Sequence, residues 1–487
     1  MASGTIISVL VVYLAILLAI GAWGARDSRS LAGYYLAGKR LPAWVIAFSS
    51  NATGESGWLL LGLTGMGYVV GVHAFWVVLG EVLGVALAWA FVALPFKRYT
   101  DRYGSITVAD YLASRFRDST HALRVVSTII ICTMVTVYTA AQFTASGKAF
   151  DAFLGTGYTG GVLIGAAVIF YYTTVGGFKA VAYSDLLQGV LMLGGLFVLP
   201  LVGVAAAGGW TSMIATLRAA DPSLLEPMGA FGWSTGGVIS AASFAGIGLA
   251  FLGTPQLLTR FMAARSEDEI VSGSLLAVLC IIVFDVGAVL TGMAGRTLMP
   301  GLADPETILP VMSADLLPAV VTGVFLVIVL AAIMSTADSL LILASSAVVR
   351  DVVQQVFRPD LDDRRLARYG KVTTVIIGLG ALGFALTEAR LIFWFVLFAW
   401  SGLASAFTPV VVCSLFWKRT TRVGALAGMI AGFLAAVVWV VAFKSRFHDL
   451  YEMWPGFIAG FGVTIAVSLF TRPPDCSVDD TPGSLSE

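Results

Sequence analysis

The chain has 487 residues, of which 58% are hydrophobic and only 12% are charged, and its formal net charge is zero. Soluble domains carry about 25% charged residues, so this composition indicates a polytopic membrane protein. The balanced charge gives no sign of a nucleic-acid partner. Four cysteines and three histidines are scattered without metal-ligand spacing. No Walker A motif and no nucleophile–base arrangement stands out, so the sequence predicts neither an ATP-driven protein nor an enzyme.

Apolar runs of about 17–25 residues are the unit expected of a bilayer crossing. The sequence contains thirteen such runs, and several are longer than a crossing requires, which suits tilted or broken helices. Their approximate bounds are 5–25, 42–70, 74–96, 125–148, 158–175, 183–207, 235–257, 272–295, 317–348, 372–388, 391–416, 423–443 and 455–471. The sequence therefore predicts an all-α integral membrane domain over residues 1–472, followed by a polar, disordered tail over 473–487.

Lysine and arginine are distributed unequally between alternate loops. Loops on one side carry 23 of these residues, loops on the other side carry 5, and Lys148 lies at a helix end. Positively charged loops are retained in the cytoplasm. The distribution therefore predicts a multi-pass protein of the cell membrane with its N-terminus outside and its C-terminus in the cytoplasm.

Two stretches, residues 49–58 and 331–339, place hydroxyls and a carboxylate inside apolar segments. A carboxylate in hydrocarbon costs several kcal/mol unless it is paired, so each stretch is a candidate functional site. The glycines and hydroxyls of the first favour an interrupted helix whose freed carbonyls can hold a cation. The seventh segment has a counterpart in Gly246, Gly248, Gly253 and Pro255. The alternative is plain helix packing, because small residues line membrane interfaces.

In the ninth segment, Ser335, Asp338 and Ser339 share one helical face, with Thr336 beside them. Hydroxyl, carbonyl and carboxylate oxygens suit a small hard cation. Asp185, at the start of the sixth segment, is either part of such a site or an interfacial acid near Lys179.

Glu81 and Asp285 also lie inside apolar segments. A polar helix-bundle interior explains them as well as a titrating role does, and the sequence leaves both interpretations open.

A series of motifs, taken in chain order, resembles the sodium:solute symporter family, and within it the bacterial sodium/proline symporters. The resemblance covers nearly the whole chain and is most specific in its last run. The motifs are Ser56-Gly57-Trp58-Leu59-Leu60, Gly176-Gly177-Phe178-Lys179-Ala180-Val181, Asp185-Leu186-Leu187-Gln188, Arg260-Phe261-Met262-Ala263, Met334-Ser335-Thr336, and the run from Ala399-Trp400-Ser401-Gly402 through Gly424-Ala425-Leu426-Ala427-Gly428-Met429-Ile430.

The resemblance implies a leucine-transporter-type core of two inverted five-helix repeats, at about 42–207 and 235–416. It implies a sodium-coupled symporter that imports a small amino acid, most simply proline. Na+ is the coupling ion, no organic cofactor is expected, and membrane lipid but no obligatory protein partner surrounds the chain.

The resemblance also implies the site residues. One sodium site would use the carbonyls of Ala52, Glu55 and Ala332 with the hydroxyls of Ser335 and Thr336. A second, present in some members, maps onto Asp185, Ser335, Asp338 and Ser339. The substrate positions map onto Ser56, Trp58, Tyr138, Ile247, Phe251 and Pro255.

The chain departs from the sodium/proline symporters at four places in or beside these sites. They have an aspartate where this chain has Gly54, a tryptophan at Ile247, a tyrosine at Phe251 and a serine at Asp338. Glu55 follows Gly54, but one residue is about 100° round a regular helix. Two alternatives therefore stay open. One is a proton- or sodium-coupled transporter of another small organic solute, with Glu55 or Glu81 titrating. The other is a substrate sensor, although no signalling domain follows the last segment.

If the sixth segment packs on the ninth, Asp185 and Asp338 face one another. Two carboxylates about 5 Å apart in a low-dielectric site require a proton or a cation between them. A sodium ion would meet this requirement. The competing interpretation is that Asp338 accepts hydrogen bonds or pairs with a cytoplasmic-side Lys or Arg.

Labelling with a membrane-impermeant thiol reagent tests the predicted orientation. Ser3→Cys should be labelled in intact cells, because the N-terminus is outside, whereas Ser486→Cys should be labelled only after the membrane is opened. The background must lack the four native cysteines. The reverse pattern would contradict the orientation, and the same labelling result for both positions would contradict the odd number of crossings.

Overall fold

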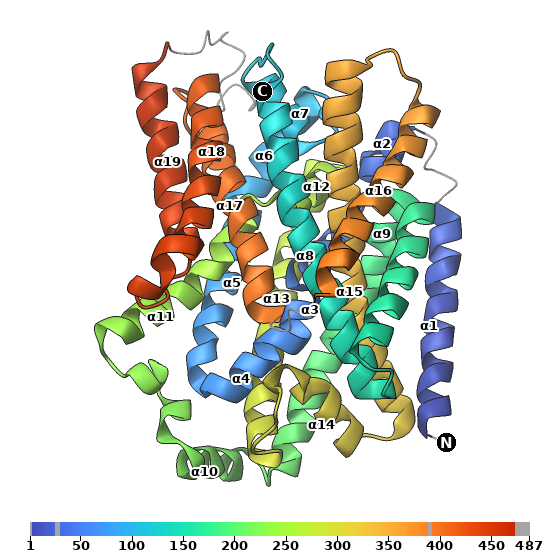
Figure 1. The fold of residues 1–487 in the computed structure, drawn as a ribbon, viewed down its shortest axis with the longest axis vertical. Helices are drawn as coiled ribbons and strands as arrows, with labels where there is room; N and C mark the ends of the chain where they lie inside the picture. The colour runs from blue at the N-terminus through green and yellow to red at the C-terminus, as the bar shows by residue number, and fades with distance from the viewer. Residues whose placement is uncertain (1, 25–29, 388–391, 473–487) are drawn as a thin grey trace.

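The computed structural model describes residues 2–24, 30–387 and 392–472, so the predicted tail 473–487 lies outside the described residues. Helix α1 (Ala2–Gly24) begins at one end of the long axis, and the last helix, α19 (Met453–Phe470), finishes at the other end (Figure 1). A chain that starts and finishes on opposite sides crosses an odd number of times.

The predicted helical crossings are present. The long helices, some in two parts, are α3 (Ala43–Gly57) with α4 (Thr64–Val70), α5 (Phe75–Leu87) with α6 (Ala93–Arg102), α8 (Ala122–Leu154), α9 (Tyr158–Ala206), α11 (Thr235–Gly246) with α12 (Pro255–Met262), α13 (Glu267–Leu298), α15 (Ala319–Ser346), α16 (Asp363–Ala385), α17 (Ile392–Phe416) and α18 (Arg422–Val438). Four shorter helices are α2 (Leu31–Leu36), α7 (Val108–Arg115), α10 (Trp210–Ala220) and α14 (Ile308–Leu316).

Ten helical stretches of the described chain are long and apolar enough to cross a membrane. One of them, Ala43–Arg102, has 60 residues and reverses at Gly71, whose φ of 56° glycine adopts without strain. The shorter apolar helix Tyr158–Tyr171 precedes Gly176–Ala206, and the chain bends between them at Gly177, with φ 65°. Together with the 23-residue α16, these account for the thirteen predicted crossings.

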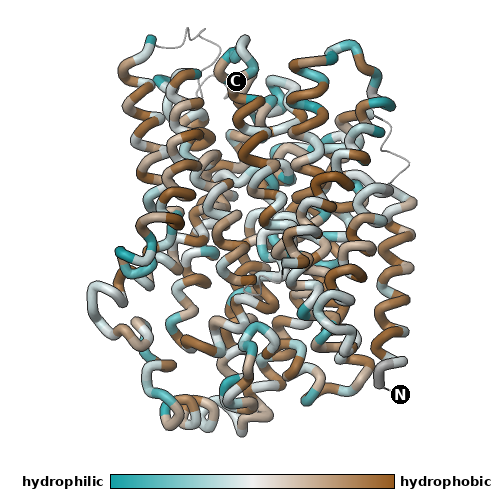
Figure 2. The backbone as a smooth tube through the Cα atoms, in the orientation of Figure 1, coloured by the Kyte–Doolittle hydropathy of each residue, from teal (hydrophilic) through white to brown (hydrophobic). Residues whose placement is uncertain are grey.

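The outer helices are apolar along their length and polar at their ends (Figure 2). In α1, Ile6, Leu10, Tyr13 and Leu17 are buried against neighbouring helices, a spacing typical of one helical face. The opposite face exposes apolar side chains, including Val11. Such a face suits contact with lipid.

The two halves of the core show the predicted inverted relation. Helix α3 opens the first repeat and α11 the second, and each is interrupted near its middle. A short helix follows the second crossing of each repeat: α7 at one end of the molecule and α14 at the other (Figure 1). Equivalent elements at opposite ends are what an inverted repeat produces.

Glycine permits the closest contact between the repeats. Gly80 and Gly84 of α5 lie directly on the backbone of Ala245 and Gly248, at the interruption between α11 and α12. A Cβ atom on Gly84 would overlap the Gly248 carbonyl oxygen. Because that neighbour is backbone, the clash cannot be relieved by a rotamer change.

Gly84→Ala should therefore lower the melting temperature of the purified protein, with a cost of about 1–3 kcal/mol or more. Gly383→Ala is the matched control, because this helical glycine has nothing within 4 Å of the added atom. Equal melting temperatures for the two variants would show that α5 does not pack as described.

Candidate functional site

The interruption of α3 is centred on Ser56, whose φ of 47° and ψ of −173° take the chain out of the helix. Its side-chain Oγ accepts a hydrogen bond from the Trp58 N–H, at 3.1 Å. The Gly57 N–H donates to Gln142 Oε1, at 3.0 Å, from α8. Side chains thus satisfy backbone groups that the break releases in the membrane interior.

The predicted sodium groups meet where α3 crosses α15. The Ser335 hydroxyl donates to the carbonyls of Ala52 and Ala332, at 2.9 and 3.1 Å. The Thr336 hydroxyl donates to the carbonyl of Thr53, at 3.1 Å. The Glu55 carbonyl instead accepts the Trp58 N–H of its own segment. The structure therefore gathers four of the five residues into a buried set of hydroxyl and carbonyl oxygens, which fits a hard cation.

An arginine occupies the place predicted for the second cation. The Arg260 guanidinium forms an ion pair with Asp185 at 3.2 Å and donates hydrogen bonds to Ser339 and Thr53. Ser339 in turn donates to Asp338 Oδ1, at 3.3 Å. Asp185 and Asp338 thus lie in one buried cluster, and one oxygen of each has no hydrogen-bond donor among the residues that the structure describes.

The structure corrects one expectation about this region and decides between two alternatives. Arg260 is one of the 23 basic residues predicted to lie in cytoplasmic loops, but it belongs to α12 and is only 1% exposed. Asp185 is fully buried and pairs with Arg260, so it is not an interfacial acid beside Lys179. The sequence signals for Arg260 were the motif that it opens, Arg260-Phe261-Met262-Ala263, and its position five residues after Pro255, the residue that restarts the broken helix.

Three predicted substrate positions meet around a tryptophan that we did not predict. The Trp400 ring makes edge contacts with Tyr138 and Phe251, at centroid distances of 6.3 and 5.4 Å. Its Nε1 donates to the Ile247 carbonyl, at 3.1 Å. A cavity of about 210 Å³ reaches Ile247.

The other three positions lie along the two breaks. Ser56 is the break in α3, and Pro255 begins α12. Trp58 stacks on Phe393 at 5.6 Å, and its Nε1 is buried without an acceptor in the described part of the chain.

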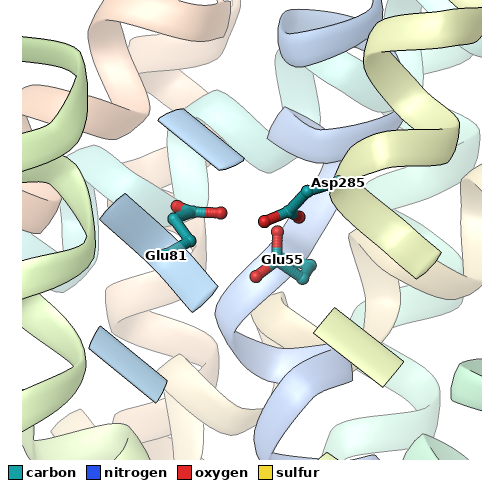
Figure 3. A group of neighbouring side chains, drawn as sticks. All are labelled: Glu55, Glu81 and Asp285. Atoms are coloured by element: carbon teal, nitrogen blue, oxygen red, sulfur yellow. The ribbon is translucent and has the colours of Figure 1, made fainter. Parts of the chain in front are cut away.

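Residues 54 and 251 lie next to each other. A Cβ atom on Gly54 would lie 2.8 Å from a ring carbon of Phe251. A larger side chain at residue 54 therefore requires the ring at residue 251 to shift. The Glu55 carboxylate points toward Glu81 and Asp285 (Figure 3).

The sequence matches the family model described as sodium:solute symporter family over residues 34–432. A high-affinity proline transporter of Bacillus subtilis is 37% identical over 469 residues, which cover 95% of this chain and 98% of the relative. A sodium/proline symporter of Staphylococcus aureus is 32% identical over 484 residues, covering 96% and 93%.

Solved structures share the fold. A Na+-coupled sialic acid symporter in a substrate-bound outward-open state superposes with a TM-score of 0.79 at 18% identity, covering 96% of this chain and 98% of that one. Mhp1, a nucleobase-cation-symport-1 family transporter, gives 0.54 at 13% identity, with coverage of 93% and 97%. These neighbours confirm the predicted leucine-transporter-type architecture. With the family model and the relatives both spanning most of its length, the chain belongs to the sodium:solute symporter family.

Proposed function

We propose that this membrane transporter is a sodium-coupled proline symporter that works in the uptake direction. The observation that carries the proposal is the set of hydroxyl and carbonyl oxygens where Ser335 and Thr336 meet the interrupted helix α3. The names of both relatives support proline as the substrate. In the proposed orientation, the N-terminus is outside and residues 473–487 are cytoplasmic, with lipid but no obligatory protein partner around the helices.

Coupling follows from the position of the sodium groups. Ala52 and Thr53 immediately precede Ser56 and Trp58 on one segment, so a cation held against α15 also fixes the backbone beside the substrate. By linkage, sodium then raises substrate affinity and substrate raises sodium affinity by the same factor. One sodium ion moving down a membrane potential gains about 2.3 kcal/mol for each 100 mV.

The substrate would lie between apolar and polar groups. Ile247, Phe251 and Trp400 form an apolar wall suited to the proline ring. The Trp58 indole N–H, buried without an acceptor, is available to the substrate carboxylate. This division of a pocket into apolar surface and a few donors is typical of small-molecule sites.

At the second predicted sodium site, the proposed cation is Arg260 itself. Its guanidinium already pairs with Asp185 and bonds to Ser339, two of the four residues that would hold the ion. A resident positive charge there removes the need for a second sodium and implies one sodium per substrate.

The transport proposal is tested with the purified protein in proteoliposomes at equal pH on both sides. An inward sodium gradient should drive accumulation of labelled proline. Ser335→Ala should raise the sodium concentration for half-maximal uptake about tenfold or more, because it removes a bridging oxygen ligand. The control is Ser346→Ala, because the Ser346 hydroxyl donates to the Leu343 carbonyl of its own helix. Uptake that needs only a pH gradient, or that excludes proline, would refute the proposal.

The role of Arg260 is tested by the sodium dependence of uptake. With one sodium, the wild type should show a Hill coefficient of about one, and Asp338→Asn should not change it. A coefficient near two that falls in Asp338→Asn would show a second sodium instead.

The melting temperature of the purified protein tests the Arg260–Asp185 ion pair independently of uptake. Arg260→Met should lower the melting temperature strongly, since it leaves Asp185 buried and unpaired, at a cost of about 3–5 kcal/mol. Adding Asp185→Asn should recover part of the loss. Additive losses in the double variant would contradict the ion pair.

A further inference from the structure

Three buried carboxylates from three helices converge on one point in the membrane interior. Glu55 lies on α3 immediately before its break, Glu81 on α5 and Asp285 on α13. One oxygen of each lies within 4.8 Å of the other two, and the side chains point toward one another (Figure 3). Glu55 and Asp285 are 0% exposed and Glu81 is 3% exposed. They are called the acidic triad here.

The triad lacks the basic partners that several other buried acids have. Asp185 pairs with Arg260, Asp110 with Arg124, and Glu306 with Lys148. In the described part of the chain, by contrast, no Lys, Arg or His pairs with a triad member, and both oxygens of Glu55, both of Asp285 and Oε2 of Glu81 are buried without a hydrogen-bond donor. Uncompensated charge in a membrane interior costs several kcal/mol per group.

The ligand atoms of the triad indicate which kind of ion could compensate its negative charge. Carboxylate oxygens are hard ligands that select hard cations. Opposed ligands of a cation such as Ca²⁺ are separated by about twice a metal–oxygen distance of 2.3–2.6 Å. The three triad oxygens lie within 4.8 Å of one another, close enough to share one such cation. Na+ shares the preference for oxygen ligands.

We propose that Glu55, Glu81 and Asp285 form a binding site for a hard metal cation, Na+ or Ca²⁺, separate from the oxygen set at Ser335. The site uses the Glu55 carboxylate, whereas the predicted sodium site uses only its backbone carbonyl. It does not depend on proline being the substrate.

Its position makes the cation a cross-link. Helix α5 packs on the interruption of the second repeat through Gly80 and Gly84. Helix α13 packs on α4 through Gly292 and on α9 through Gly287. A cation bound to α3, α5 and α13 therefore joins helices of both repeats next to both breaks. Binding to the folded state alone stabilises it in proportion to the logarithm of cation concentration.

The experiment measures the melting temperature of the purified full-length protein, by tryptophan fluorescence, against NaCl or CaCl2 at constant ionic strength. Ser335→Ala is used as the background, so that the other sodium site does not contribute. Either cation should raise the melting temperature. Asp285→Asn or Glu81→Gln should weaken the apparent cation affinity at least about tenfold, as loss of a ligand does.

Asp268→Asn is the matched control, because this exposed acid lies on the same helix as Asp285. It should keep the full cation response. Asp285→Asn should also melt higher than its background when no cation is present, since it relieves repulsion between carboxylates. A higher melting temperature without cation would show that the variant is folded and has lost only the cation site, because a misfolded variant would melt lower.

The separate titrations with NaCl and CaCl2 identify the ion. A response to NaCl alone assigns Na+, and a response to CaCl2 assigns a divalent cation. No response to either cation, or an equal response in the triad variants, overturns the site. Because no uptake is measured, this result is independent of the transport assay.

Discussion

A hydrocarbon interior offers no water to backbone groups, so each spanning segment must satisfy its own hydrogen bonds or find partners in neighbouring helices. At the break at Ser56, backbone groups of this segment lose their partners within the helix. The freed backbone groups form hydrogen bonds with the side chains of Ser56, Gln142, Ser335 and Thr336. The two hydroxyls on α15 that satisfy freed carbonyls are also the groups suited to a cation. The hydroxyl and carbonyl oxygens that stabilise the broken helix are thus also the oxygens of the proposed sodium site.

The same constraint governs charge. Helix α8 carries Arg124 near one end and Lys148 near the other, about 36 Å apart at the helical rise of 1.5 Å per residue. Arg124 pairs with Asp110 of α7 and with Asp351. Lys148 pairs with Glu306 at 2.5 Å, and Glu306 also accepts backbone N–H groups at the start of α17. A single rigid helix therefore joins an ion cluster at each end of the molecule.

Three sets of membrane-embedded polar groups differ in how their charge is compensated. The oxygen set at Ser335 is neutral and suits an exchangeable ion. The Asp185 cluster contains its own cation, Arg260. The acidic triad contains none in the described residues. All three sets touch α3 or its break, which makes the interrupted helix the element on which ion binding, substrate binding and repeat packing converge.

The sequence by itself determined the thirteen crossings, because apolar length is a local property that the bilayer thickness sets. It also located both interruptions, since Gly, Pro and hydroxyl residues act on their own helix, and it placed Ser335, Asp338 and Ser339 on one face through helical periodicity. Motif resemblance supplied the family.

Only the tertiary structure decided which polar groups share a site. Arg260 and Asp185 are 75 positions apart, and Glu55 and Asp285 are 230 apart, on helices whose relative rotation no local pattern encodes. Trp400 likewise came to lie beside predicted substrate positions only when α17 packed against the second break. Charge pairing in a low dielectric depends on separations of a few ångströms, and helix packing sets those separations.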